Sequence, residues 1–289
     1  MIDAGSTLEE LISHGAYDVF VEAGLPLAFR HANGIGYLND IRLQPQDAKD
    51  FVDNLYLLAA GRNEERLIVH GNDEFSFPLE GVARFRVSAF RRQGSFSAVI
   101  RVIPFVLPTP EELRIPDEVM SLADLKEGLV LVTGGPGSGK TTTLACLVRR
   151  INETREAHII TLEDPIEYVQ EHERSIVSQR EIITDTEGFL TGFYAAMKQS
   201  PDVILTGELE GIEMISLALK AAEGGILVLS AQLSVHSAAT AERLAGAFPA
   251  DRREAVMHRL SGALKAVVSE EMIVNEVGNR VPRFNVWRP

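Results

Sequence analysis

The spacing of hydrophobic residues in the first third of the chain indicates a mixed α and β domain. Over residues 45–60 the apolar residues Phe51, Leu55 and Leu58 recur at intervals of three to four residues, which is the spacing of one helix face. The segment ends at Gly61, and glycine is a common helix terminator. We therefore predict an amphipathic helix over residues 45–60.

From residue 75 onwards the hydrophobic period changes to two. Apolar and polar residues alternate on both sides of Gln93-Gly94, a dipeptide typical of tight turns. The apolar positions are Phe85, Val87 and Ala89 before the turn and Phe96, Ala98 and Ile100 after it. This alternation predicts an antiparallel hairpin with one buried face and one face that carries arginines.

A proline-rich stretch separates two parts of the chain. Its prolines are Pro104, Pro108, Pro110 and Pro116. Because proline interrupts helices and central strands, we predict an extended linker over residues 104–117. The linker separates an N-terminal domain over 1–103 from a second domain over 118–289.

In the second domain, continuous apolar runs alternate with helical stretches. The runs cover residues 129–133, 159–162, 203–206 and 226–230. Such runs predict a parallel sheet with helices on both faces. Residues 272–276 and 281–286, with a turn near Gly278-Asn279, predict an antiparallel hairpin at the sheet edge.

Residues 134–141 carry a phosphate-binding motif, because they read G-G-P-G-S-G-K-T and fit the pattern G-x-x-x-x-G-K-S/T. The alternative is a chance glycine-rich turn, but a predicted strand precedes the motif and a predicted helix follows it. Lys140 is expected to reach the β- and γ-phosphates, and the Thr141 hydroxyl to ligate Mg²⁺. We predict an α/β fold with a RecA-like P-loop NTPase core, ATP and Mg²⁺ as ligands, and a smaller mixed α/β N-terminal domain. The residues expected to bind the phosphates are Gly134, Gly135, Pro136, Gly137, Ser138, Gly139, Lys140, Thr141 and Thr142.

Acidic residues follow two of the predicted strands. Glu208 closes an apolar strand in the manner of a Walker B element, so it is the candidate to polarise an attacking water; a solvated carboxylate is the alternative. Asp202, at the start of that strand, is more typical of a cap. Glu163 and Asp164 follow another strand and are candidates to hold Mg²⁺, partly through water, although an Asp-Pro turn by itself is commonplace.

Basic and nucleophilic residues leave more alternatives open. Arg84, Arg86 and Arg101 lie either on a solvated sheet face or in an active site completed by a neighbouring domain or subunit. His236 is either a sensor near the fourth strand or a surface residue. Cys146 is more typical of a buried apolar residue than of a nucleophile.

Composition excludes several classes of protein. The net charge of −13 argues against nonspecific binding to nucleic acid or to an anionic membrane. A single cysteine excludes an intramolecular disulfide and fits a reducing compartment. The chain has no apolar run near the roughly 20 residues that span a bilayer and no signal-peptide layout, so we expect a cytoplasmic protein without membrane insertion.

Several segments, in order along the chain, resemble motifs of the type II/IV secretion and type IV pilus ATPase superfamily, most closely its pilus-retraction ATPases. The resemblance covers nearly the whole chain. The segments are A-G-L-P at 23–26, G-V-A-R-F-R-V at 81–87, R-V-I-P at 101–104, I-T-L-E-D-P-I-E-Y-V at 160–169 (the Asp box), Q-R-E at 179–181 and P-D-V-I-L-T-G-E at 201–208 (Walker B).

The resemblance implies a homohexamer of two-domain subunits with a PAS-like N-terminal domain, which hydrolyses ATP to retract a pilin fibre through a membrane platform protein. It implies that Glu208 is the catalytic glutamate and Glu163 the main Asp-box carboxylate. It also implies that Arg84, Arg86 and Arg101 approach the nucleotide phosphates. The lack of a further N-terminal domain and of a four-cysteine zinc motif argues against the larger assembly and type II secretion ATPases.

The chain departs from the family pattern at several points. Both histidine positions of the His box (T-G-H, then G-T-L-H-T) are apolar here, at Ile226 and Leu233, and His236 is displaced. Glu210 stands where the family has an arginine, and Ser269-Glu270-Glu271 replaces S-Q-T. The sequence ends at Pro289, without the A-I-R-N-L-I-R-E motif that is associated with retraction.

Three functions follow from these features. The leading hypothesis is a hexameric ATPase that powers pilus retraction and twitching motility. The second is a nucleotide-binding accessory subunit of weakened activity that works with an active paralogue, as the altered His box and Glu210 suggest. A nucleic-acid motor is the third and is disfavoured by the charge.

Overall fold

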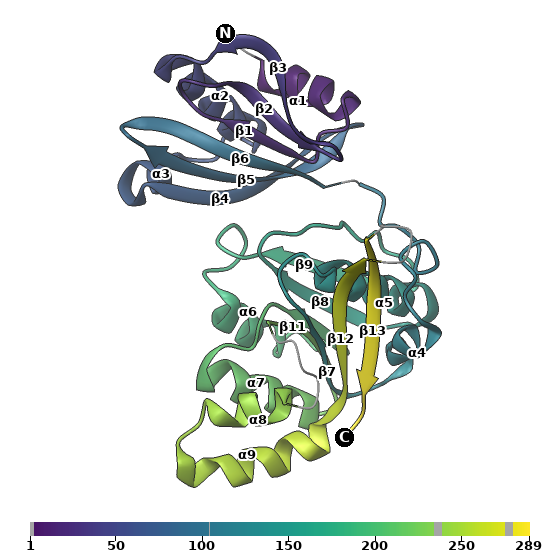
Figure 1. Cartoon of the computed structure of the whole chain (residues 1–289). Helices are drawn as coiled ribbons and strands as arrows, with labels where there is room; N and C mark the ends of the chain where they lie inside the picture. Colours follow the sequence, from purple (N-terminus) through teal and green to yellow (C-terminus); the bar gives the residue numbers. More distant parts are fainter. Residues whose placement is uncertain (1–2, 104, 234–238, 275–279) are drawn as a thin grey trace. The chain divides into compact units, whose positions relative to one another are not determined.

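The computed structural model describes residues 3–103, 105–233, 239–274 and 280–289. The chain divides into two compact units, Met1–Val106 and Leu107–Pro289, each with its own hydrophobic core (Figure 1). The division falls close to the predicted start of the linker, at the proline-rich segment.

Unit 1 is a six-stranded antiparallel sheet in the order β3-β2-β1-β6-β5-β4, with helices packed on it. Helix α2 contacts β1 and β6, α1 lies beside α2, and α3 contacts β4 and β5. The elements are α1 (Ala4–Ser13), β1 (Asp18–Val21), β2 (Pro26–His31), β3 (Gly34–Arg42), α2 (Pro45–Leu58), α3 (Glu65–His70), β4 (Asn72–Leu79), β5 (Ala83–Arg92) and β6 (Ser95–Ile103).

The two elements predicted in unit 1 are confirmed. Helix α2 begins with a proline at its first position, and the Asp47 carboxylate accepts a hydrogen bond from the Gln44 N–H at 2.7 Å, which caps the helix start. Its buried residues include Phe51 and Leu55, the predicted face. The hairpin is β5 and β6, and both turn residues, Gln93 and Gly94, have positive φ, as a tight hairpin turn requires.

Unit 2 is built on a seven-stranded sheet in the order β13-β12-β7-β11-β10-β8-β9. All neighbouring strands are parallel except β12 and β13. The elements are α4 (Asp117–Met120), η1 (Ser121–Asp124), β7 (Gly128–Thr133), α5 (Lys140–Thr154), β8 (His158–Glu163), β9 (Ile176–Glu181), α6 (Phe189–Ala196), β10 (Val203–Thr206), α7 (Gly211–Glu223), β11 (Leu227–Gln232), α8 (Thr240–Gly246), α9 (Ala250–Ala263), β12 (Leu264–Val274) and β13 (Arg280–Trp287).

One core lies on each side of this sheet. Helices α6 to α9 contribute to the core on one face, and α5 with the segment that leads into β7 contributes to the other (Figure 1). The predicted α/β class with a parallel sheet is confirmed. No helix among the described residues is long and apolar enough to cross a membrane.

Two stretches differ from the sequence expectation. Most of the segment predicted as a linker packs into unit 2, because Leu107 and Ile115 are buried beside α5 and the Arg149 guanidinium donates to the Leu107 carbonyl at 2.9 Å. Proline prevents regular structure there, but the apolar residues between the prolines still bury. The predicted edge hairpin starts much earlier than residue 272, at Leu264, and its turn near 278–279 lies outside the described residues.

Candidate nucleotide site

The predicted phosphate loop connects β7 to α5, and α5 begins at Lys140. The Lys140 ammonium donates to the carbonyls of Gly134 and Gly135 at 3.0 and 2.9 Å, so it lies over the loop. Burial lowers the pKa of this ammonium, and the carboxylates of Glu208 and Glu270 act in the opposite direction. The structure therefore places the loop lysine and two carboxyl groups within electrostatic reach of each other.

Strand β12 backs the loop so closely that glycine is needed at two positions. A Cβ atom on Gly134 would lie closer than 3.0 Å to the Glu270 carbonyl oxygen and to the Ser138 hydroxyl oxygen. A Cβ atom on Gly139, which has φ +111°, would lie closer than 3.0 Å to the Glu270 carboxylate. Gly135, by contrast, has open space around it. Gly134 and Gly139 are thus required by the fit between the loop and β12.

Glu270 is a member of the site that sequence reasoning missed. It appeared there only as a departure from a family motif, although it lies on β12 directly beneath the loop. Its carboxylate accepts a hydrogen bond from the Thr143 hydroxyl at 3.0 Å, and the residue is only 5% exposed. Burial raises the pKa of this carboxyl group to about 7, against the lowering effects of the Thr143 hydrogen bond and the Lys140 charge.

The candidate acids lie at the carboxyl ends of neighbouring strands. Glu163 is the last residue of β8, and Glu208 follows β10 by two residues. The Glu163 carboxylate accepts hydrogen bonds from the Thr161 hydroxyl at 2.6 Å and from the Gln179 amide at 3.0 Å. Gln179 lies on β9 within the Q-R-E segment, and its amide group orients the Glu163 carboxylate. Asp164 is exposed.

The positions of the His box lie on and around β11. Ile226 is half-buried just before the strand, and Leu233 is 47% exposed just after it. Between them, Gln232 is buried, and its amide oxygen accepts a hydrogen bond from Arg243 on α8 at 2.6 Å. His236 lies outside the described residues. Glu210 is exposed immediately before α7, where a helix N-terminus favours an acid.

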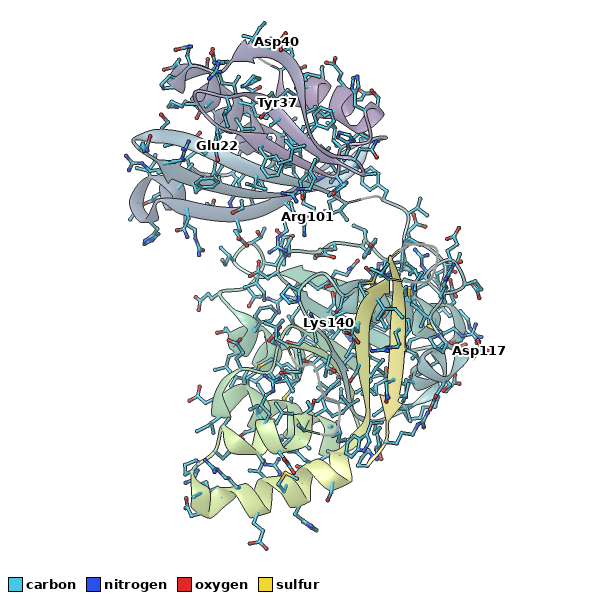
Figure 2. All side chains as sticks on the ribbon, viewed as in Figure 1. Glu22, Tyr37, Asp40, Arg101, Asp117 and Lys140 are labelled. Carbon is cyan, nitrogen blue, oxygen red and sulfur yellow. The ribbon has the colours of Figure 1, made fainter. Side chains whose placement is uncertain are left out.

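The three candidate arginines belong to unit 1, and the phosphate loop belongs to unit 2. Figure 2 labels Arg101 in unit 1 and Lys140 in unit 2. Arg86 on β5 is paired in register with Arg101 on β6, so they share a sheet face. The Arg101 guanidinium donates to buried Asp18 at 2.9 Å, and Arg86 bonds to Glu74 at 3.3 Å. Arg84 bonds to the hydroxyl of a neighbouring serine on β4. Their role toward a nucleotide stays a prediction.

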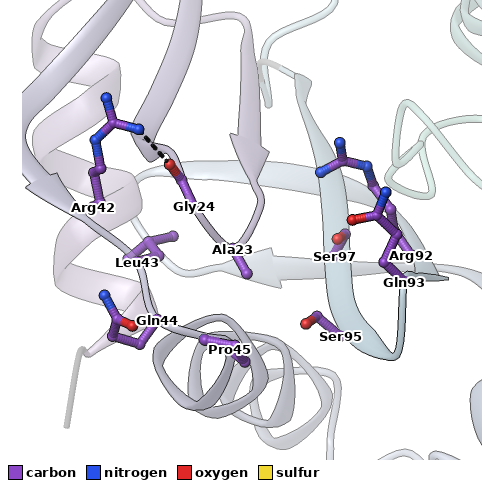
Figure 3. A pocket seen from close by; sticks show the side chains of 10 residues that line it. All are labelled: Ala23, Gly24, Arg42, Leu43, Gln44, Pro45, Arg92, Gln93, Ser95 and Ser97. Carbon is purple, nitrogen blue, oxygen red and sulfur yellow. Dashed lines mark hydrogen bonds between the residues drawn. The ribbon is translucent and has the colours of Figure 1, made fainter.

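Each unit contains a cavity large enough for a small ligand. In unit 2 a cavity of about 440 Å³ lies beside the phosphate loop, with Gly139 and Glu270 on one side and Arg114, Ile115 and Phe284 among its other walls. In unit 1 a cavity of about 420 Å³ is lined by arginines and serines and by the start of the A-G-L-P segment (Figure 3). Of the two, the cavity in unit 2 borders the predicted phosphate loop.

The donor groups suit Mg²⁺. This ion prefers oxygen ligands, keeps several waters and is commonly held by one or two protein groups together with phosphates. The Thr141 hydroxyl group and the Glu163 and Asp164 carboxylates are oxygen donors on exposed or half-buried residues at this edge of the sheet. Within the described ranges no group of three or more His, Cys, Asp or Glu side chains gathers to hold a metal ion. The oxygen atoms that these three residues offer fit the ligand preference of Mg²⁺.

The sequence and the structure of this chain are both similar to those of known proteins. The family described as type II/IV secretion system protein matches residues 4–277. The type IV pilus retraction ATPase PilT of Pseudomonas aeruginosa is 39% identical over 272 residues, which cover 94% of this chain and 78% of that protein. The type IV pilus ATPase PilU of the same organism is 34% identical over 268 residues, 92% of this chain and 69% of that protein. The crystal structure of the pilus retraction motor PilT with bound ADP superposes with a TM-score of 0.93 at 38% identity and covers 100% of this chain and 84% of that one.

Proposed function

This chain belongs to the type II/IV secretion system protein family, and we propose that it is a PilT-like ATPase subunit that powers retraction of a type IV pilus. The observation that carries the proposal is the complete phosphate loop, with Glu163 and Glu208 at the carboxyl ends of strands of the same sheet, in a chain 39% identical to a retraction ATPase over 94% of its length. The similar motor structure contains ADP, which supports a nucleotide in the cavity beside the loop.

Each residue of the site has a task in this proposal. The loop N–H groups, the start of α5 and Lys140 bind the β- and γ-phosphates. Thr141, Glu163 and Asp164 hold Mg²⁺ directly or through water, and the ion supplies charge neutralisation on the phosphates. Glu208 orients the attacking water and accepts its proton. Gln179 and Thr161 keep the Glu163 carboxylate in one orientation.

We propose that the working unit is a homohexamer. In it, Arg84, Arg86 and Arg101 of the N-terminal domain complete the nucleotide site and stabilise charge on the transferred phosphoryl group. Within unit 1, Arg101 bonds to Asp18 and Arg86 bonds to Glu74. The partner is a membrane platform protein of the pilus machine, on the cytoplasmic side where ATP is available. A net charge of −13 disfavours a nucleic acid as partner.

Steady-state ATP hydrolysis by the purified chain with Mg²⁺ tests the proposal. Glu208→Gln should lower kcat by about 10²- to 10⁴-fold, the usual contribution of a positioned general base, and leave ADP binding intact. Glu213→Gln, an exposed carboxylate in the first turn of α7, is the matched control and should keep the full rate. Equal rates for the chain and its Glu208→Gln variant would refute catalysis at this site.

A motility assay tests the coupling to a pilus. The gene is expressed in Pseudomonas aeruginosa that lacks its own retraction ATPase, and twitching is measured. We expect twitching to return with the chain and to stay absent with Glu208→Gln. A chain that hydrolyses ATP in solution and assembles in the cell but never restores twitching would belong to a different machine.

A second candidate function is an accessory subunit that acts with an active paralogue. The apolar residues Ile226 and Leu233 at the two His-box positions favour it, because a side chain that places charge or water in the transition state is absent from both. Hydrolysis near the Glu208→Gln background alone, but a raised rate after mixing with an active retraction ATPase, would support this function. Full activity of the chain alone would exclude it.

A further inference from the structure

An acidic side chain forms part of the floor of the phosphate loop. The Glu270 carboxylate lies against Gly139 on one side and accepts the Thr143 hydroxyl hydrogen bond on the other, and the Glu270 carbonyl oxygen lies against Gly134. A buried negative charge directly below the N–H groups that receive phosphate would oppose the binding of an anion. The position therefore calls for a neutral side chain when nucleotide is bound.

We propose that Glu270 is a positioning residue that supports the phosphate loop in its protonated form, so that nucleotide binding is accompanied by uptake of one proton at this carboxyl group. The inference rests on the proposed nucleotide binding at this loop and adds a proton to it. A protonated carboxyl group has nearly the size and shape of a glutamine amide, so the Glu270→Gln substitution imitates the neutral form.

Burial disfavours the ionised form of Glu270, whereas the Thr143 hydrogen bond and the Lys140 charge favour it. None of the ion pairs found among the described residues includes Glu270, and the Lys140 ammonium bonds to the carbonyls of Gly134 and Gly135 instead. Glu270 is only 5% exposed, and such burial disfavours the charged form of its carboxyl group. A bound phosphate would draw Lys140 toward itself and add negative charge, and both effects favour the protonated form.

The other charged and titratable groups around Glu270 do not remove this effect. Cys146 on α5 stays a neutral thiol over the neutral range, because burial raises its pKa to about 11. Glu112 and Arg114, from the segment that borders the same cavity, contribute one charge of each sign. Glu271, the next residue on β12, is exposed and pairs with Arg283 on β13 at 2.6 Å. Among these groups, Glu270 is the buried carboxyl group that lies against the phosphate loop.

The sign of the expected pH dependence follows directly. Nucleotide binds the protonated form, so affinity is highest below the pKa of Glu270, which burial raises to about 7, and falls as pH rises through that value. If the ionised form binds negligibly, the dissociation constant rises roughly tenfold between pH 6 and pH 8. The β-phosphate of ADP also titrates in this range, so a variant without the carboxyl group is needed for comparison.

The test measures binding of a fluorescent ADP analogue to the whole chain from pH 6 to pH 8.5 at constant ionic strength. The ratio of the dissociation constant of the native protein to that of Glu270→Gln should rise about tenfold between pH 6 and pH 8, because titration of ADP itself cancels in the ratio. Glu271→Gln, the exposed neighbour on the same strand, should follow the native protein. A ratio that stays constant overturns the inference.

A second measurement does not depend on the folding of Glu270→Gln. Calorimetric titration with ADP at pH 8, in buffers of different ionisation enthalpy, counts the protons that binding takes up. We expect the native chain and Glu271→Gln to take up close to one proton each, and an uptake near zero overturns the inference. If the native chain binds no ADP at any pH, the proposed function fails as well, whereas binding without proton uptake defeats the inference alone.

Discussion

Replacing Gly134 by alanine should weaken nucleotide binding far more than replacing its neighbour Gly135. The two residues are adjacent in the loop, and neither has φ in the left-handed region, so backbone strain does not separate them. Their surroundings do. A methyl group on Gly134 would meet the Glu270 carbonyl oxygen and the Ser138 hydroxyl at less than 3.0 Å, a separation that real Cβ atoms essentially never show. A methyl group on Gly135 meets nothing within 4 Å.

The size of the effect follows from the geometry. To make room, the loop and β12 must separate by roughly 0.7 Å or more, which is enough to move loop N–H groups out of the range of good hydrogen bonds. The Glu270 carbonyl belongs to the sheet backbone and cannot rotate away as a flexible side chain would. Overpacking of this kind costs about 1–3 kcal/mol, which corresponds to an ADP dissociation constant about 5- to 150-fold higher.

The assay is fluorescence anisotropy with a labelled ADP, with circular dichroism to confirm that both variants are folded. Gly137→Ala provides an intermediate case, because its φ of +70° is strained for alanine by about 1–2 kcal/mol although its surroundings are open. We expect affinity to fall in the order Gly135→Ala, Gly137→Ala, Gly134→Ala. If Gly134→Ala binds ADP within twofold of Gly135→Ala, the fit between the loop and β12 does not position the phosphate site.

Three further predictions concern pH, orientation and stability. The pKa of Glu270 rises from 4.5 to about 7 on folding, so the free energy of unfolding should fall by about 2 kcal/mol between pH 5.5 and pH 8. The Glu270→Gln variant should lack this decrease. Urea unfolding followed by Trp287 fluorescence measures the free energy of unfolding at each pH. Gln179→Leu should lower kcat about tenfold with little change in ADP affinity, because the Glu163 carboxylate loses the hydrogen bond that orients it. An unchanged kcat would contradict this orienting role of Gln179. Asp73→Asn should destabilise unit 1 by about 3 kcal/mol, because the buried Asp73 carboxylate accepts hydrogen bonds from a tyrosine and an arginine. Glu74→Gln, at an exposed ion pair, should cost less than about 1 kcal/mol. Equal denaturation curves for the two variants would contradict this prediction.

The parts of the fold that the sequence predicted are those encoded over short distances. Helix α2 was predictable because its buried face repeats within the segment, and the β5–β6 hairpin because its turn dipeptide and its alternation lie side by side. The phosphate loop was predictable for the same reason, since eight consecutive residues contain both the glycines and the lysine. Glu163 and Glu208 were found because each follows an apolar strand.

Other parts depend on contacts between distant segments. Strand β12 was predicted only at its end, because residues 264–269 pair with β7, which lies more than a hundred residues earlier in the sequence. The proline-rich segment shows no regular pattern, yet Leu107 and Ile115 bury against α5. Glu270 and Thr143 are 127 residues apart in sequence, so no local pattern announces the carboxyl group beneath the loop.

The residues at which this chain departs from the family pattern fall into two groups, which lie on different elements of the site. Glu270 lies on the binding side, which is formed by β7, the phosphate loop, α5 and β12. Ile226, Leu233 and Glu210 lie around β11 and the end of β10, beside the strand that leads to Glu208. Because the two groups contact different elements, changes in the first should alter affinity and its pH dependence, and changes in the second should alter turnover. Binding and hydrolysis are therefore separable properties of this chain, and an intact phosphate loop is direct evidence for the first alone.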